Sequence, residues 1–332
     1  MCYKDELQEK NWETLQRALD KDGAPAFIRR YFILCKSKAT AKNYWSTIRD
    51  LLMWAIENKI IPKNSISEIT PEDMLYIEAP EVNMYLNYKV SHDNITLTTI
   101  ETKKNTLRSF WKYLVETNQC PVSNNVIGSV TYDGIKSSIY NNSIKKCPKD
   151  EEIKAMEERI RAKKDPFLRE RNLLVLRVLK GTGVREGELA GLDLQDVDFV
   201  GDEWGGAYIL VLGKGSYRKE NKRKVYLTKD AQNAIQEWLE IRKKKKHIID
   251  KDALFLNKNG KRLTESNIQA IFKVYGNGLT PHMLRHWYAT IIANQDGGSL
   301  AAQQQLGHHS ILTTRQNYIN NTYRMRDILD AI

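Results

Sequence analysis

Residues 205–228 read GGAYILVLGKGSYRKENKRKVYLT and interrupt a chain whose other long segments have helical periodicity. Two short apolar runs, AYILVL and KVYLT, lie on either side of a polar segment, which favours a β-hairpin about a Gly-Lys-Gly turn. Helical patterns precede the hairpin in LRERNLLVLRVLKGTG and REGELAGL, and follow it apart from a short strand or turn at LFLNKNG. The sequence therefore predicts an α+β fold that is mainly α with a small β-hairpin or sheet.

A separate helical domain is expected over residues 24–118. Apolar residues recur at helical spacing in TAKNYWSTIRDLLMWAIENKII and in LTTIETKKNTLRSFWKYLVETN. Between them, the helix-start signal TPED at 70–73 predicts a further helix in SEITPEDMLYIEAPEVNMYLNYKV. Residues 1–23 are expected to be a short N-terminal extension. Residues 119–147 have the Asn-, Ser- and Gly-rich composition of a linker, so 148–332 is expected to be a second domain.

The composition is globular and basic. The 332 residues are 41% hydrophobic and 28% charged, with 52 Lys and Arg against 41 Asp and Glu, or +11. Residues 1–147 hold 20 basic and 17 acidic side chains, and the rest hold 32 and 24, so the second domain carries +8 of the +11. Such an excess favours polyanions without specifying a sequence, although a merely basic soluble protein has the same balance.

The cysteines and the apolar runs of the sequence indicate the cellular compartment of the protein. Cys2, Cys35, Cys120 and Cys147 are scattered and form no CxxC pair, so neither a zinc ribbon nor a disulfide framework is suggested. No apolar run approaches membrane-spanning length, and the start, MCYKDELQEKNWETLQ, lacks the apolar core of a signal peptide. We expect a cytoplasmic protein without a membrane partner.

Histidine and arginine concentrate in the second domain. In TPHMLRHWYAT, His282 and Arg285 are three residues apart and share one helical face. His282 and His286 also have the i,i+4 spacing of a zinc site, but the glutamate of HExxH and a third ligand are missing, so no metal is expected. GTGVREGELAG places Arg185 after a glycine turn and Glu188 one turn later. It matches neither GxGxxG nor a P-loop, and an ordinary surface ion pair is the simpler explanation when this segment is read alone.

Together with LGHHSILTTRQNY at 306–318, these residue types suit metal-free phosphoryl transfer. Two guanidinium groups can clamp the oxygens on which a phosphodiester transition state spreads its charge. An attacking phenol needs its proton accepted, and a leaving sugar oxygen needs a proton donor such as lysine or histidine. Half-buried packing is the alternative for the paired histidines and the tyrosine. No carboxylate cluster for Mg²⁺ is required, so no cofactor is expected.

In the motifs TGVREGEL, LGKG, HMLRH and LGHHS....NY, the chain resembles the tyrosine recombinase, or phage integrase, family over nearly its whole length. Each motif alone is weak, but their order and spacing make the match highly specific. The resemblance implies seven site residues, of which the first six are catalytic and the last supports them: Arg185, Lys214, His282, Arg285, His308, Tyr318 and Glu188.

Two of these assignments have competitors. The family places its tyrosine nine or ten residues beyond the LGH histidine; Tyr318 is at ten, Asn317 is at nine, and Tyr323 lies too far on. The hairpin also offers Lys219, Lys222 and Lys224, but among the hairpin lysines only Lys214 lies in the Gly-Lys-Gly turn.

The resemblance implies a site-specific, Xer-like recombinase or integrase of a mobile genetic element or chromosome, which cleaves and rejoins duplex DNA through a 3′-phosphotyrosine bond. The helical domain resembles the family's core-binding (SAM-like) domain, which forms a two-domain DNA clamp with the catalytic domain. A dimer on one site and a tetramer in synapsis are implied, in a DNA-associated protein. A type IB topoisomerase and a non-catalytic architectural DNA-binding protein are the alternatives.

Two further surfaces are predicted. The helical domain carries six basic candidates for DNA contact, for each of which a solvated helix surface is the simpler explanation: Lys42, Arg49, Lys103, Lys104, Arg108 and Lys112. In the tail TYRMRDILDAI, an apolar face repeats at i, i+3, i+4 and i+7 from Met325 to Ile332. The resemblance implies that this tail docks on a neighbouring protomer, and packing on its own domain is the alternative.

Overall fold

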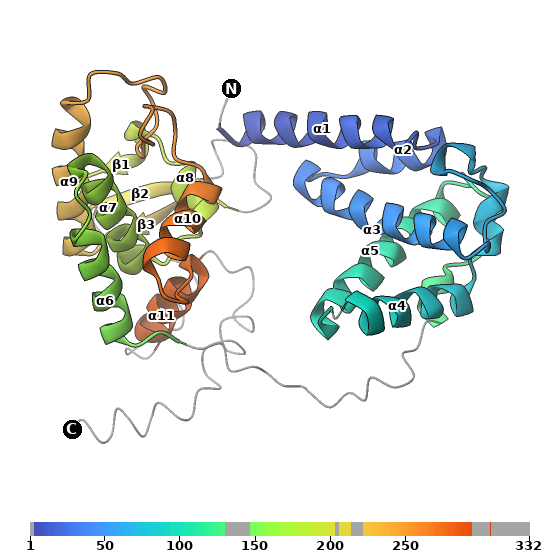
Figure 1. Cartoon of the computed structure of the whole chain (residues 1–332). Coiled ribbons are helices and arrows are strands. Elements are labelled where there is room, and N and C mark those ends of the chain that lie inside the picture. Colours follow the sequence, from blue (N-terminus) through green and yellow to red (C-terminus); the bar gives the residue numbers. More distant parts are fainter. Residues whose placement is uncertain are drawn as a thin grey trace. The chain divides into compact units, whose positions relative to one another are not determined.

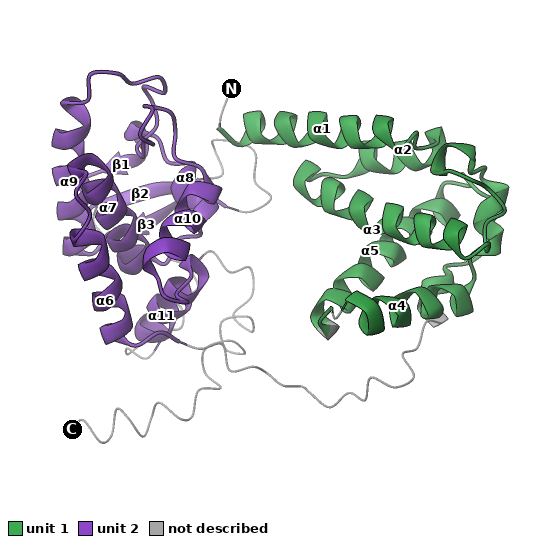
Figure 2. Cartoon of the chain, in the orientation of Figure 1, with its two compact units in different colours: residues 1–139 green, residues 140–332 purple. Residues whose placement is uncertain are grey.

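The computed structural model describes residues 3–93, 95–129, 147–202, 206–213, 222–293 and 306. It divides the chain into two compact units, residues 1–139 and 140–332, each of which is described by itself (Figure 2). Three predicted catalytic residues lie outside the described residues, as does the tail: Lys214, His308, Tyr318 and residues 323–332.

All the regular elements in the described part of unit 1 are helices (Figure 1). Its elements are α1 (Tyr3–Lys21), α2 (Ala26–Leu34), α3 (Lys38–Glu57), η1 (Ile66–Glu68), η2 (Glu72–Tyr76), α4 (Ala79–Asp93), α5 (Leu97–Glu116) and η3 (Val126–Ser129). The two long helices begin at capped residues: Ser37 Oγ accepts from the Thr40 amide, and Thr96 Oγ1 accepts from the Thr99 amide, each at 3.3 Å. Helix α3 contacts both α1 and α5, and the helical character predicted from periodicity is confirmed.

Helix α1 belongs to the core of unit 1. The sequence predicts that residues 1–23 are a short extension, but Leu15 and Leu19 of α1 are completely buried in the same cluster as Phe32, Trp111 and Tyr85. Burying two leucines contributes roughly 1.5–3 kcal/mol each relative to exposed side chains. Residues 3–21 are therefore a structural part of the helical unit.

The predicted start of the second helix also differs from the structure. The signal at 70–73 begins only η2, where the Asp73 carboxylate accepts from the Thr70 amide at 2.7 Å. Helix α4 then starts separately at Ala79. Pro80 has no amide hydrogen to continue a helix from η2, but it is tolerated in the first turn of a new one, which explains the break.

Unit 2 packs helices around one central helix. Its elements are α6 (Asp150–Arg161), α7 (Pro166–Thr182), α8 (Glu186–Ala190), η4 (Leu194–Asp196), β1 (Val197–Asp198), β2 (Tyr208–Leu212), β3 (Lys222–Tyr226), α9 (Lys229–Lys243), α10 (Glu265–Tyr275) and α11 (Pro281–Ala293). Helix α7 buries residues on every side of its second half and contacts α6, α9 and α11. None of the helices within the described ranges is long and apolar enough to cross a bilayer.

The predicted hairpin is confirmed and has a third strand. The order is β1-β2-β3, with antiparallel neighbours and the register Leu212↔Lys222, Val211↔Arg223 and Ile209↔Val225. The turn at 214–221 lies outside the described residues. Strand β1 has two residues, too few for a pattern of alternation to reveal it. At LFLNKNG, a bridge pairs Leu256 with Arg262.

Candidate active site

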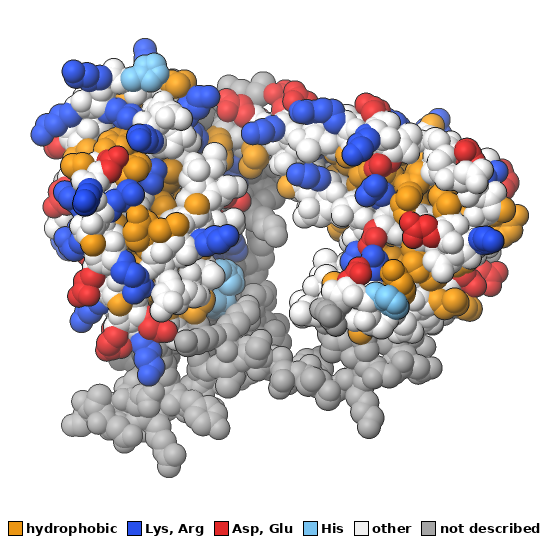
Figure 3. Space-filling model, in the orientation of Figure 1, with side chains coloured by type: hydrophobic (Ala, Val, Ile, Leu, Met, Phe, Trp, Pro, Cys, Tyr) orange, Lys and Arg blue, Asp and Glu red, His pale blue; other side chains and the backbone are white. Residues whose placement is uncertain are grey.

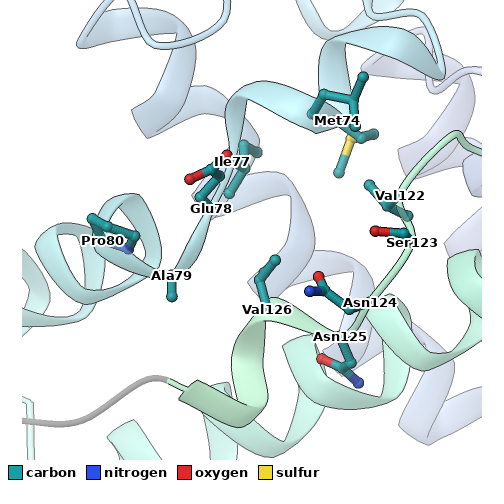
Figure 4. Close-up of a pocket in the computed structure, with 11 residues that line it drawn as sticks. Met74, Ile77, Glu78, Ala79, Pro80, Val122, Ser123, Asn124, Asn125 and Val126 are labelled. Atoms are coloured by element: carbon teal, nitrogen blue, oxygen red, sulfur yellow. The ribbon is translucent and has the colours of Figure 1, made fainter.

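A groove of about 500 Å³ lies in unit 1, between η2, the start of α4 and residues 122–126 (Figure 4). Among its lining residues, Glu78 is the one ionisable side chain. The described parts of the predicted catalytic motifs lie in unit 2 instead, where arginines gather around one carboxylate.

The segment TGVREGEL folds as the end of α7 and the first turn of α8. Arg185 is the N-cap residue of α8, and Glu188 occupies the third helical position. Glu188 Oε2 accepts from the Arg185 amide at 3.0 Å, and Glu188 Oε1 accepts from Arg185 Nη1 at 3.0 Å. A negative side chain at a helix start is favoured by the unpaired amides and the dipole. The Glu188 side chain, only 3% exposed, thus orients Arg185, which is 34% exposed.

Gly183 provides the sharp turn between the two helices. It ends α7 at φ 63°, ψ 17°, a left-handed conformation that glycine adopts without strain. A Cβ at this position would lie 2.5 Å from Tyr288 Cδ1 and 3.0 Å from Leu306 Cδ2. The glycine therefore lets α11 and Leu306 approach the start of α8.

Arg285 of α11 hydrogen-bonds to the same turn. Its Nη1 donates to the Gly183 carbonyl at 2.7 Å, and its Nη2 donates to the Leu306 carbonyl at 2.8 Å. Nη1 also lies 4.0 Å from Glu188 Oε2, and both side chains are 3% exposed. Arg185 and Arg285, predicted from separate motifs, are thus brought to one carboxylate. Leu306, the first residue of the LGH motif, is completely buried beside Tyr288.

His282 is held by its neighbour on α11. The Nε2 atoms of His282 and His286 lie 2.9 Å apart, with the two rings nearly perpendicular. One ring must donate and the other accept, so the tautomers of the two imidazoles are coupled. His286 is buried, and its carbonyl accepts from Thr290 Oγ1 at 2.8 Å. The i,i+4 spacing noted in the sequence therefore corresponds to a hydrogen bond between rings.

Arg223 of β3 belongs to this cluster and was missed by the sequence analysis. Its Nη2 donates to Glu188 Oε2 at 3.0 Å and to the Leu306 carbonyl at 3.4 Å. Burial lowers the pKa of the Arg223 guanidinium, and the Glu188 carboxylate opposes that shift. The available signal was periodicity: Arg223 alternates with Lys224 and lies on the same strand face as the buried Val225, against the rule for solvent-facing arginines.

The two described competitors of Lys214 have carboxylate partners. Lys222 pairs with Asp196, and Lys224 Nζ lies 2.7 Å from Asp202 Oδ2. Lys219, like Lys214, lies outside the described residues.

The six basic residues proposed for DNA contact differ in how they are held. Lys103 is 18% exposed and pairs with Asp50 at 2.9 Å, while Arg49 pairs with Asp22 at 2.9 Å. Lys104 is half-buried, and the other four of the six are exposed: Lys42, Arg49, Arg108 and Lys112. On the visible face of unit 1, basic side chains are interspersed with acidic and uncharged ones (Figure 3). Lys103 therefore has a structural role within unit 1, and contact with DNA stays a prediction for all six.

Comparison with known proteins gives one consistent result. The model of the phage integrase family matches residues 149–325. The chain is 28% identical to tyrosine recombinase XerC of Serratia marcescens over 271 residues, which are 80% of this chain and 82% of that protein. It is also 28% identical to XerC of Shigella flexneri over 230 residues, or 68% and 70% of the two chains.

Solved structures share the fold. A XerH recombinase bound to a palindromic difH substrate has a TM-score of 0.63 at 21% identity, covering 88% of this chain and 80% of that one. A lambda integrase dimer bound to a COC′ core site has a TM-score of 0.58 at 16% identity, covering 92% and 80%.

Proposed function

The chain belongs to the phage integrase family of tyrosine recombinases, and we propose that it cuts and rejoins duplex DNA at a specific site with Tyr318 as nucleophile. The Tyr318 phenol oxygen attacks the phosphorus, the bond from phosphorus to the 5′ oxygen breaks, and a 3′-phosphotyrosine and a 5′-hydroxyl result. The hydroxyl of a partner strand then reverses the step. Each exchange conserves one phosphoester bond, so no external energy source is required.

Five other residues stabilise charge and transfer protons in this reaction. Arg185, Arg285 and His308 stabilise the charge on the non-bridging oxygens. Lys214 donates a proton to the leaving 5′ oxygen, and His282 assists proton removal from the phenol. None of these roles requires a metal ion.

One observation carries the proposal: Arg185 and Arg285 meet at the Glu188 carboxylate, beside the main chain that leads into the LGH motif. Glu188 keeps two positive groups close together, which would otherwise repel each other. The exposed part of Arg185 can then reach a phosphate, while Arg285 is fixed from behind by the Gly183 and Leu306 carbonyls. Two guanidinium groups held at one point suit a phosphodiester better than any single cation does.

Duplex DNA is the proposed partner, with exposed basic side chains of both units neutralising phosphates. The relatives named above are recombinases, which favours strand exchange over topoisomerase-like relaxation. We also propose the family's assembly, a dimer on one site and a tetramer in synapsis, and a DNA-associated location.

Covalent trapping tests the proposal. Duplexes that bind the protein are selected from a random pool, and a nick near the centre lets the cleaved fragment diffuse away so that the adduct accumulates. We expect a denaturation-resistant protein–DNA adduct in EDTA for the wild type and for Tyr323→Phe, but not for Tyr318→Phe. An adduct formed by Tyr318→Phe would show that another residue is the nucleophile. Loss of the wild-type adduct in EDTA, restored by Mg²⁺, would refute the metal-free mechanism.

A further inference from the structure

Arg223 hydrogen-bonds two parts of the site, the Glu188 carboxylate and the Leu306 carbonyl. Arg285 hydrogen-bonds the Leu306 carbonyl as well, but its Nη1 lies 4.0 Å from Glu188 Oε2. A single nitrogen, Nη2, donates to Glu188 Oε2 on α8 and to the main-chain carbonyl of Leu306. Its side chain is 20% exposed, against 34% for Arg185. Arg223 therefore faces the carboxylate more than solvent.

Removing Arg223 would leave the negative charge of Glu188 with less compensation. The carboxylate is almost completely buried, and its Oε2 would retain the hydrogen bond from the Arg185 amide. The next guanidinium is that of Arg285, whose Nη1 lies 4.0 Å from Oε2. Because an under-compensated buried charge is costly, Glu188 would draw Arg285 away from the Gly183 carbonyl.

The Leu306 carbonyl would change as well. It accepts from Arg285 Nη2 at 2.8 Å and from Arg223 Nη2 at 3.4 Å. With Arg223 absent, the second of these hydrogen bonds is lost, and a shift of Arg285 toward Glu188 would weaken the first. Leu306, the first residue of the LGH motif, would then lose its fixed position relative to the arginines.

We propose that Arg223 is a positioning residue of the active site, which holds Glu188 and the Leu306 main chain so that Arg185 and Arg285 address the same phosphate. This role rests on the proposed function. It is distinct from direct phosphate contact, since Arg223 acts through Glu188 and Leu306. It is also distinct from proton donation to the leaving group.

Arg177 of α7 offers a matched control. Its side chain is 19% exposed, and its Nη2 lies 3.1 Å from Glu157 Oε1, so its burial and its ion pair resemble those of Arg223. Its partners lie on α6 and α9, away from Glu188. Arg177→Gln therefore reports the general effect of losing a half-buried ion pair in unit 2.

The experiment compares Arg223→Gln, Arg223→Lys and Arg177→Gln in the full chain. Three quantities are measured for each: single-turnover adduct formation on the nicked duplex, affinity for an uncut half-site, and thermal unfolding. We expect adduct formation by Arg223→Gln to slow about 10- to 100-fold, as when partners that orient other active-site groups are lost. Affinity should stay within about twofold, because no phosphate contact is removed. Arg223→Lys should recover part of the rate, and Arg177→Gln should cleave at the wild-type rate.

A double-mutant cycle tests the route of the effect. In a Glu188→Gln background, Arg223→Gln should cost much less than it does alone, because coupled residues are not additive. Additive effects would overturn the proposal, as would a cleavage rate equal to that of Arg177→Gln or a fall in affinity that matches the fall in rate. Full rescue of Arg223→Gln by a sulfur leaving group would assign it to proton donation and would overturn the proposal too. If the wild type itself forms no adduct, the proposed function fails. If the wild type forms the adduct and the Arg223 variants form it at the same rate, this inference alone fails.

Discussion

Replacing Gly183 by alanine should damage both stability and cleavage, because this residue combines a left-handed backbone with close packing. The added Cβ would lie 2.5 Å from Tyr288 Cδ1, whose ring is only 6% exposed, and 3.0 Å from Leu306 Cδ2. Contacts this short force the ring, the helix or the turn to move.

The expected cost has two parts. An alanine in the left-handed region costs roughly 1–2 kcal/mol. Forcing an extra methyl group into a packed interior adds about 1–3 kcal/mol. Gly183→Ala should therefore lower the free energy of unfolding by about 2–5 kcal/mol in total.

Two other glycines separate these parts. Gly278 has φ +91° and no atom within 4 Å of an added Cβ, so Gly278→Ala reports backbone strain alone. Gly206 also has open space but no left-handed φ, so Gly206→Ala should be nearly neutral. Calorimetry of the four proteins should show that the free energy of unfolding is nearly equal for the wild type and Gly206→Ala, lower for Gly278→Ala and lowest for Gly183→Ala.

Cleavage provides the second measurement. The Gly183 carbonyl accepts from Arg285, so any shift of the turn displaces the arginine. Gly183→Ala should form the adduct more slowly even at temperatures where it is fully folded, whereas Gly278→Ala should not. Equal stability losses for these two variants would refute the packing argument, and an unchanged cleavage rate would refute the link between this turn and Arg285.

Other predictions concern separate parts of the chain. Lys214→Ala should slow cleavage, and a substrate with a sulfur leaving group should restore much of the rate, since thiolates leave without protonation; absence of rescue would remove Lys214 from this role. Although burial alone would raise it, hydrogen bonds from Lys89, Lys103 and Tyr85 hold the pKa of Asp50 below its usual value. The stability that Asp50 contributes over Asp50→Asn should therefore be present above about pH 4 and be lost as the pH falls through the lowered pKa; a difference that persists at lower pH would contradict this. Deleting residues 323–332 should leave half-site binding intact but reduce cooperative filling of the second half-site in gel-shift titrations, and unchanged cooperativity would exclude docking between protomers. Affinity for DNA should fall steeply with salt, and a flat dependence would contradict extensive phosphate contact.

Local spacing predicted the parts of the site that depend on one turn of helix. Arg185 and Glu188 are three residues apart at a helix start, and His282 and Arg285 are three apart within a helix, so sequence alone places each pair on one face. The hairpin was predictable for a similar reason, because two short apolar runs on either side of a polar segment with a Gly-Lys-Gly turn are a property of neighbouring residues.

What sequence could not provide was the approach of one element to another. Arg223 is close to Glu188 because β3 packs near α8, and no spacing in the chain encodes that distance. The same holds for α1, whose place in unit 1 depends on the burial of Leu15 and Leu19 against other helices. Strand β1 depends entirely on pairing with β2.

The balance of charge around Glu188 has a consequence for inhibition. In the described part of the site, three guanidinium groups surround one carboxylate, which leaves two formal positive charges. A phosphodiester brings one negative charge, whereas its five-coordinate transition state carries two, so only the latter balances both positive charges of the site. Small trigonal-bipyramidal dianions, of which vanadate bridging a phenol and a sugar hydroxyl is an example, should therefore occupy this site more tightly than an ordinary phosphate ester of the same shape.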